Sequence, residues 1–437
     1  MNTQTPRSRQ IIAAVIGNAL EWYDFIVFGF VSVVISRLFF PASSEYAALL
    51  LTFATFGVGF FMRPVGAIVL GLYADRAGRK AALQLVILLM TVAVALVAFA
   101  PTYASIGVGA PILIVVSRLL QGFATGGEFS SATSFLVECA PVHRRGFFGS
   151  LQMVGQGLAA LLGALAGAMV TTGLAPEQLD SWGWRLPFLL GLIIGPVGLY
   201  IRRDLDETEE FRAQCGGAAP SVRFGAVLSE HSRAVAASFL LIVCGTTAYY
   251  VVLLYMPTYA KTQLALPLKD AFVAQMLAIA WMILLIPLFG ALSDRIGRKP
   301  LLRGAAIGYL FLPYPLFAWV CADPSFVRLL GLQLAMCSVV AAYYGPVSTT
   351  LAEQFPTRVR STGTGIAYNF AVMLFGGFAP FIVTWLIRET GSQTAPAFYI
   401  MLGASAGIAA TFLLKEEGPH SVLAESPSLA AAIVPDL

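Results

Sequence analysis

The chain has 437 residues, of which 58% are hydrophobic and 11% are charged, against about 25% charged residues in an ordinary soluble domain. This composition excludes a soluble globular protein and predicts an all-α membrane protein. The net charge of +4 does not require a nucleic-acid partner, because basic residues beside membrane spans serve to orient them.

Apolar stretches long enough to cross about 30 Å of hydrocarbon recur along the whole chain. We predict twelve transmembrane helices, six in each half. They cover residues 12–38, 46–72, 81–101, 111–137, 147–170, 184–201, 234–256, 272–292, 301–321, 327–350, 362–387 and 396–414. The expected units are an N-terminal six-helix bundle (1–203), a cytoplasmic central linker (204–232), a C-terminal six-helix bundle (233–415) and a cytoplasmic tail (416–437).

The first stretch follows a basic N-terminus, as a signal peptide would. It is too long for one and carries the polar cluster Glu21 to Asp24, so we expect it to remain as the first span.

Two short motifs occur once in each half at nearly the same offset. Gly71 to Lys80 reads GLYADRAGRK, and 219 residues later Gly290 to Lys299 reads GALSDRIGRK. The spacing E-x-x-P-x-x-x-R occurs from Glu138 to Arg145 and again 215 residues later, from Glu353 to Arg360. Parallel repeats of helices are typical of secondary transporters, so the duplication indicates a carrier.

The distribution of basic residues predicts the orientation of the chain. With both termini in the cytoplasm, nineteen Lys and Arg residues fall in cytoplasmic segments and six in outer segments. This asymmetry agrees with the positive-inside rule.

Five ionisable residues lie deep inside predicted spans, away from their ends, and all belong to the first half: Glu21, Asp24, Arg63, Arg118 and Glu128. A charge near the bilayer centre costs at least about 2.5 to 3.5 kcal/mol, so these side chains are expected to face a wet cavity or each other. Depth along the helices indicates two ion pairs, Asp24 with Arg118 and Arg63 with Glu128. Alternatively, the two charges of either pair only neutralise each other and hold the helices in place.

A buried carboxylate beside an arginine suits proton coupling. The arginine favours the ionised acid and dehydration favours the neutral acid, so a change in water access shifts the balance. An anionic substrate that binds Arg118 would release Asp24 to take up a proton. Gln121 continues the polar stripe of Arg118 on the same helix.

The second half supplies neutral hydrogen-bonding groups at positions expected to face the cavity. Alternatively, these side chains only pack against other helices, with their hydroxyl groups hydrogen-bonded. They are Thr246, Thr247, Tyr249, Tyr250, Tyr343, Tyr344 and Asn369.

With these residues the sequence resembles the major facilitator superfamily, of which the paired GxxxDRxGRK loops are the hallmark. Gly17 to Phe25, Arg63 to Gly66, Arg118 to Glu128 and Trp182 to Phe188 resemble its metabolite-proton symporter family over nearly the whole chain. Within that family, SSEYAALLLTF and YMPTYAKT look most like citrate and tricarballylate symporters.

The resemblance implies a major facilitator fold and roles for particular residues. It implies a cytoplasmic gate made of Asp75, Arg76, Arg79, Lys80, Asp294, Arg295, Arg298 and Lys299. It implies proton coupling by Asp24, with Glu21 and Glu128 as further candidates. The expected substrate-binding residues are Arg118, Gln121, Arg63, Asn18, Tyr249, Tyr250, Tyr344 and Asn369. Glu128 and Arg63 are also expected to form a secondary relay or an inner gate.

The leading functional hypothesis is a proton-coupled symporter that imports a small di- or tricarboxylate, as a monomer in the bacterial inner membrane, with the proton as coupling ion and no cofactor or metal. The alternatives are uptake of a zwitterionic osmolyte, proton-antiport efflux and a non-transporting sensor. The osmosensing relatives have a long C-terminal coiled coil that this chain lacks. An enzyme is not expected, because HExxH and Walker A patterns are absent and no histidine lies deep in a span.

Overall fold

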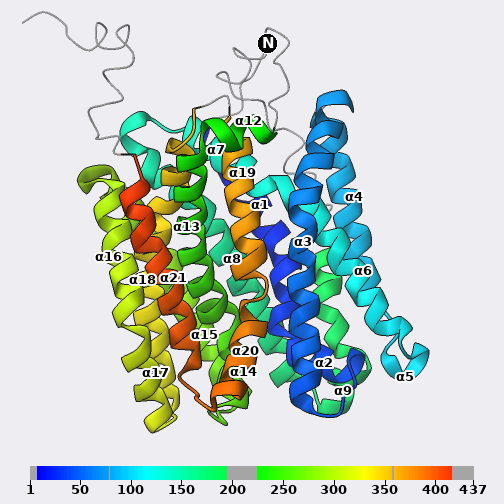
Figure 1. Cartoon of the computed structure of the whole chain (residues 1–437). Helices are drawn as coiled ribbons and strands as arrows, with labels where there is room; N and C mark the ends of the chain where they lie inside the picture. The colour runs from blue at the N-terminus through cyan, green and yellow to red at the C-terminus, as the bar shows by residue number, and fades with distance from the viewer. Residues whose placement is uncertain (1–6, 78, 194–223, 357–358, 416–437) are drawn as a thin grey trace, which may run out of the picture.

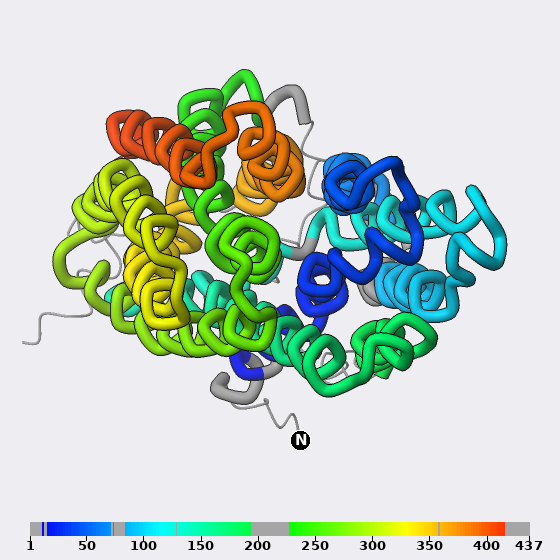
Figure 2. Tube along the Cα trace, turned by 90° about the horizontal axis from the view of Figure 1, so that it is seen from below, coloured from blue at the N-terminus to red at the C-terminus, as the bar shows by residue number. Residues whose placement is uncertain are grey.

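The computed structural model describes residues 7–77, 79–193, 224–356 and 359–415, and in these ranges the regular structure is entirely helical. The helices stand side by side as one upright bundle (Figure 1). Seen along the bundle, the helices of the first half lie mainly to one side and those of the second half to the other (Figure 2).

The first half begins with a broken span, α1 and α2, and continues with helices joined by short turns. Its elements are α1 (Arg7–Phe30), α2 (Ser32–Phe39), α3 (Glu45–Ala77), α4 (Arg79–Ala98), α5 (Tyr103–Ile106), α6 (Gly109–Ala124), η1 (Thr125–Gly127), α7 (Glu128–Glu138), η2 (Val142–Arg144), α8 (Arg145–Gly173), α9 (Pro176–Ser181) and η3 (Gly183–Arg185).

The second half contains two π-helices, η4 and η5, inside longer helices. Its elements are α12 (Phe224–Glu230), α13 (Ser232–Tyr249), η4 (Tyr250–Tyr255), α14 (Met256–Thr262), α15 (Leu268–Ile296), α16 (Arg298–Phe311), α17 (Pro313–Ala322), α18 (Phe326–Glu353), α19 (Arg360–Ala371), η5 (Val372–Gly376), α20 (Ala379–Thr390) and α21 (Ala395–Leu413).

Each of the twelve predicted spans coincides with helix in the described ranges. Nine helices there are long and apolar enough to cross a membrane, and the bent pair α1 and α2 is a tenth. The two remaining predicted spans appear as the shorter apolar helices Gln84–Ala98 and Gly183–Ile193.

The structure differs from the prediction in local details. The first span is not continuous, because its helix axis bends by 62° between Phe30 and Ser32. The predicted linker contains the short helix α12. Its acidic stretch from Asp204 to Pro220 and the tail after Lys415 lie outside the described residues.

Glycines allow α3 and α6 to pack backbone against backbone. A Cβ atom on Gly122 would overlap the carbonyl of Gly59, and one on Gly126 would overlap the carbonyl of Arg63. Small residues are the usual means of close helix packing within a membrane. The contact fixes the relative positions of the two helices that carry Arg63 and Arg118.

Helices α8 and α15 form the closest seam between the two halves. A Cβ on Gly290 would lie 2.7 Å from the carbonyl oxygen of Gly146, and one on Gly157 would lie 2.8 Å from Ile283. This seam runs beside the space in which the candidate site lies.

Candidate functional site

Two neighbouring cavities lie in the bundle, the larger between the halves and the smaller against residues of the first half. The larger is lined by Trp22, Phe129, Met153, Gln156, Leu241, Ile242, Gly245, Thr246, Tyr249, Tyr250, Tyr344, Val347, Tyr368 and Val372. The smaller is lined by Glu21, Trp22, Phe25, Arg63, Thr125 and Phe129. Trp22 and Phe129 line both cavities, so the cavities form two chambers of one site.

The larger cavity has a neutral wall with unused hydrogen-bonding capacity. The Gln156 Nε2, Thr246 Oγ1 and Tyr250 hydroxyl atoms are buried and have no hydrogen-bond partner in the part of the chain that the structure describes. Burying such atoms without a partner is unfavourable, and a bound polar ligand would satisfy them. These three groups come from α8, α13 and η4, so both halves contribute to the wall.

The smaller cavity contains a buried cation. The Arg63 side chain is only 2% exposed, and its guanidinium carbon lies 4.8, 4.6 and 4.6 Å from the ring centroids of Trp22, Phe25 and Phe60. Aromatic faces stabilise a cation without neutralising its charge. Arg63 is therefore equipped to bind an anion in this chamber.

Tyr368 connects the two chambers. Its hydroxyl lies near the Gln156 and Arg63 side chains, and its ring stacks on Phe129 with a centroid distance of 3.7 Å and an interplanar angle of 6°. Because Phe129 belongs to the first half and Tyr368 to the second, this stack joins the halves at the edge of the site.

Asp24 and Arg118 lie together in a dry region of the first half. Asp24 is 6% exposed and Arg118 is fully buried, and the two charges interact electrostatically. The Asp24 Oδ1 atom and all three guanidinium nitrogens have no hydrogen-bond partner among the described residues. The Arg118 guanidinium lies 4.2 Å from the ring centroid of Phe28. The two charges therefore interact without a direct hydrogen bond between Asp24 and Arg118.

The Asp24 carboxyl packs against Gly191 of the sixth span. A Cβ atom on Gly191 would overlap Asp24 Oδ1 and would lie 3.2 Å from Asp24 Cγ. Neither Asp24 nor Arg118 is among the described lining residues of the two cavities. The arginine that faces the cavity is therefore Arg63.

The other predicted site residues divide into cavity residues and helix ties. Tyr249, Tyr250 and Tyr344 line the larger cavity, and Glu21 lines the smaller. The Tyr249 hydroxyl already donates to the Gln156 carbonyl oxygen at 3.3 Å.

Two predicted substrate ligands are instead engaged in contacts between helices. The Asn18 side chain exchanges hydrogen bonds with Gln152 at 3.1 and 3.2 Å. Asn369 donates to the Gly126 carbonyl oxygen at 2.7 Å. Gln121 is fully buried near Arg118, and neither of its amide atoms has a partner among the described residues. The Glu128 side chain, and with it the predicted pair with Arg63, lies outside the described side chains.

Sequence reasoning did not single out Gln156, Tyr368, Trp22 or Phe129 as site residues. Gln156 follows Gly155 in a stretch of small residues, which is typical of close helix packing. A buried amide between glycines in a membrane span was the one available signal for it. The three aromatic residues gave no comparable signal.

At the end of the bundle that carries α7 and α12, a polar network joins the halves; we call it the latch. Asp294 accepts from the backbone amides of Gly146 and Phe147 at 2.8 and 3.0 Å, at the start of α8. Carboxylates are favoured at helix N-termini, where they bind unpaired amide groups. The remaining latch contacts are Arg298 with Asp294 at 3.0 Å, Arg298 with Glu353 at 3.3 Å and Arg360 with Glu138 at 3.0 Å.

Of the expected gate residues, Asp294 and Arg298 thus lie in the latch. The side chains of Asp75, Arg76, Arg79 and Lys80 lie outside the described ones. Arg295 lies in the last turn of α15 and Lys299 in the first turn of α16, beside these two residues.

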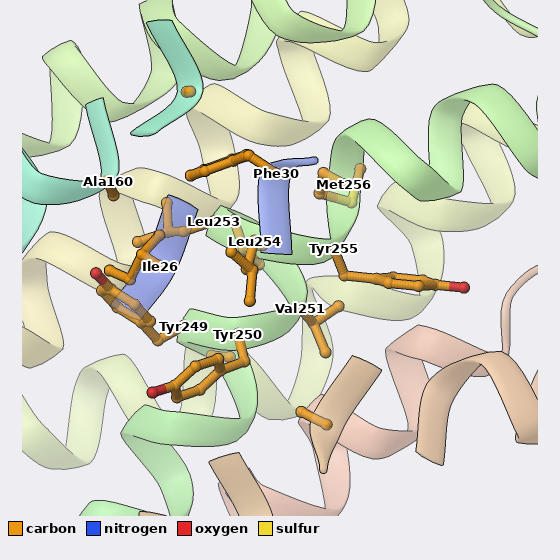
Figure 3. Close-up of a cluster of buried hydrophobic side chains, with 14 of the residues drawn as sticks. Ile26, Phe30, Ala160, Tyr249, Tyr250, Val251, Leu253, Leu254, Tyr255 and Met256 are labelled. Atoms are coloured by element: carbon orange, nitrogen blue, oxygen red, sulfur yellow. The ribbon is translucent and has the colours of Figure 1, made fainter. Parts of the chain in front are cut away.

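The opposite end is closed by an apolar cluster. In Figure 3, Ile26 and Phe30 of α1 lie beside Leu253 and Leu254 of η4. Leu254 fills the notch at Gly29, where a Cβ would lie 2.5 Å from its Cδ1 atom. The latch at one end and this apolar cluster at the other both join the two halves in this structure.

A stretch of sequence matching the Major Facilitator Superfamily model covers residues 14–371, with a second match at 276–435. The chain is 39% identical to a citrate-proton symporter of Salmonella typhi over 405 residues, which cover 92% of this chain and 93% of the relative. It is 30% identical to the proline/betaine transporter of Escherichia coli K12, with 96% of this chain and 86% of the relative covered.

The fold is also similar to solved structures. A crystal structure of a D-xylose-proton symporter superposes with a TM-score of 0.71 at 20% identity, covering 93% of this chain and 97% of the other. This similarity concerns the fold alone.

Proposed function

Since the chain belongs to the major facilitator superfamily, we propose that it is a proton-coupled symporter that imports a small organic anion, a di- or tricarboxylate such as citrate or tricarballylate. The observation that carries the proposal is the buried Arg63 guanidinium that faces the smaller cavity, next to the cavity between the halves. Relatives with up to 39% identity that are named citrate-proton symporters support the substrate class.

In this proposal the substrate spans both chambers. One carboxylate binds Arg63, because a buried cation is the strongest attraction that an anion finds here. The rest of the molecule enters the larger cavity, where Gln156, Thr246 and Tyr250 provide hydrogen bonds. Because both halves line this cavity, a bound substrate draws them together.

The coupling proton is carried by Asp24. Ionised Asp24 on α1 attracts Arg118 on α6, and protonation removes that attraction. The helix α1 also carries Glu21, Trp22 and Phe25, which line the Arg63 chamber. A shift of α1 relative to α6 would therefore move residues of the substrate chamber. This movement links proton uptake to substrate binding.

Alternating access requires that the latch and the apolar cluster open in turn. With both termini in the cytoplasm, the latch closes the cytoplasmic side, and opening it would release substrate inwards. The chain acts in this scheme as a monomer in the inner membrane, and the proton is the coupling ion.

The test is uptake of labelled citrate and tricarballylate into proteoliposomes under an imposed pH gradient. Inside-alkaline pH is expected to drive accumulation, and a protonophore to abolish it. Protein-free liposomes with the same gradient are the control. Uptake that ignores the gradient would contradict proton coupling, and absence of uptake of every carboxylate would contradict the substrate class.

One observation favours a second candidate, uptake of a zwitterionic osmolyte. Trp22, Tyr249, Tyr250, Tyr344 and Tyr368 line the larger cavity, and such aromatic walls attract quaternary ammonium groups. A betaine could place its carboxylate at Arg63 and its ammonium group among these rings. Glycine betaine uptake under the same gradient, with tricarballylate inactive, would select this candidate.

A further inference from the structure

The charge of the cavity walls differs between the two chambers. Among the described lining residues, the charged ones are Glu21 and Arg63, and both belong to the smaller cavity. The larger cavity is walled by aromatic, aliphatic and neutral polar side chains. A substrate with several carboxyl groups therefore meets the Arg63 cation, with Glu21 in the same chamber, at one end and a neutral wall at the other.

We infer that a polycarboxylate is bound with at least one carboxyl group protonated, namely the group that enters the larger cavity. The inference rests on the proposed function and names the form of the substrate that is carried. It follows that part of the proton flux crosses the membrane on the substrate itself, in addition to any proton on Asp24.

The first physical reason is desolvation. An ionised carboxylate that leaves water for a closed cavity without a cation is strongly disfavoured, whereas a protonated carboxyl group loses much less hydration. The side chains that line the larger cavity are buried, apart from the partly buried Tyr344, so bulk water compensates a charge there only weakly.

The second reason is hydrogen-bond matching. A protonated carboxyl group needs both a donor and an acceptor, whereas an ionised one only accepts. Thr246 and Tyr250 present hydroxyls that can do either, and Gln156 presents an amide donor. All three are buried and unpartnered among the described residues, so the wall suits a neutral carboxyl or carboxamide.

The experiment compares tricarballylate with its monoamides, in which an uncharged carboxamide replaces one carboxyl and imitates the protonated form at every pH. Dissociation constants are measured by calorimetry on the purified full-length protein between pH 5.5 and 7.5. Tricarballylate affinity is expected to fall by up to about tenfold per pH unit as the required proton becomes scarce. At least one monoamide is expected to lose far less affinity.

The ratio of the two affinities separates the effect of substrate protonation from the effect of protonation of the protein. Charged groups near the site are Glu21 on α1 and Arg63 on α3, with Asp24 and Arg118 deeper in the first half, and Glu128 on α7, whose side chain is not described. Tyrosines from α13, η4, α18 and α19 also face it. Titration of any of these groups affects both ligands alike and cancels in the ratio.

A variant gives an independent reading. Gln156→Lys places a cation in the larger cavity and should make tricarballylate binding at pH 7.5 at least tenfold stronger relative to the monoamide. Gln156→Met, of similar size and uncharged, removes a hydrogen-bond donor and should weaken both ligands, without strengthening tricarballylate relative to the monoamide. If the lysine variant does not fold, the comparison of ligands on the native protein still decides.

The outcomes separate the inference from the function on which it rests. A pH-independent affinity for tricarballylate, with every monoamide at least tenfold weaker, would overturn the inference and leave the tricarboxylate proposal standing. No binding of either ligand at any pH would overturn both.

Discussion

The two halves of the molecule bury different chemistry at corresponding positions. In the first half, the fully buried Arg118 interacts with Asp24. Gln333 follows Arg118 by 215 residues, the same offset that separates Glu138 from Glu353. Gln333 is also fully buried, but its amide donates to Gln275 at 3.1 Å. At this position a buried cation in one half thus corresponds to a buried neutral amide in the other.

The comparison shows how a duplicated fold can divide two tasks. Charges respond to protons and anions, and the described charges within the site belong to the first half. The second half supplies tyrosines, Thr246 and two π-helices, which are frequent at functional sites and shape the cavity wall. Coupling is therefore expected to be sensitive to changes in the first half, and selectivity to changes in both.

The largest effect is expected from Asp24→Asn. The amide cannot take up and release a proton, so accumulation under a pH gradient should be abolished while exchange at equal pH continues. Labelled-substrate uptake in proteoliposomes measures both. Gln333→Leu alters a polar residue of equal burial in the other half and should retain accumulation. Full accumulation by Asp24→Asn, or loss of accumulation in Gln333→Leu, would contradict the expectation that coupling depends on the charged residues of the first half.

A second change distinguishes the two buried arginines. Arg63→Gln should weaken substrate binding about 100-fold, since loss of a buried charge partner costs about 2 to 5 kcal/mol. Arg118→Gln should change the dissociation constant little and impair gradient-driven uptake instead. Calorimetry with tricarballylate gives the constants. Equal losses of affinity in both variants would show that Arg118 also contacts the substrate.

A third change addresses the latch between the halves. Glu138→Gln weakens a contact with Arg360 in which both side chains are only 11% exposed, and hydrogen bonds to charged groups contribute about 1.5 to 3 kcal/mol. The latch end should open more often, so a cysteine placed at Ser130 should be alkylated on the order of tenfold faster. Asp180→Asn, which breaks the exposed pair with Arg37 within the first half, is the control and should leave the rate unchanged.

The smallest effect is expected in the amide pair of the second half. Gln333→Leu leaves Gln275 without its partner and should lower the free energy of unfolding by about 1 kcal/mol. The double change of Gln275 and Gln333 to Met should be less destabilising than the single one, because both polar groups are removed together. Thermal unfolding in detergent measures the difference. A double variant less stable than the single one would show that the amides have further partners.

Much of the architecture was predictable because it depends on the local amino-acid composition. Twelve apolar stretches, the duplicated loops and the five ionisable residues of the first half can all be read without knowledge of packing. The superfamily and the helical fold followed from them and are confirmed by the comparisons. The bend at the end of α1 was missed, because span length alone does not reveal where a helix breaks.

The site itself was predictable only in part. Arg63 and Arg118 look equivalent in the sequence, since both are arginines within apolar spans. Helix α3 packs on α6 through Gly59 and Gly122. In this arrangement Arg63 faces the smaller cavity, whereas Arg118 lies beside Asp24. Asn18 and Asn369 were expected in the site for their polarity, yet both tie helices together.

By itself, the sequence determined that the chain crosses a membrane many times, consists of two related halves and buries charge in only the first. These properties follow from hydrophobicity, repetition and residue type, which act along the chain. Only the tertiary structure decided which buried groups meet, that Gln156 and Tyr368 complete the larger cavity, and which contacts join the halves at each end. These features depend on the rotation and close approach of helices far apart in sequence, which small residues such as Gly59 and Gly122 permit.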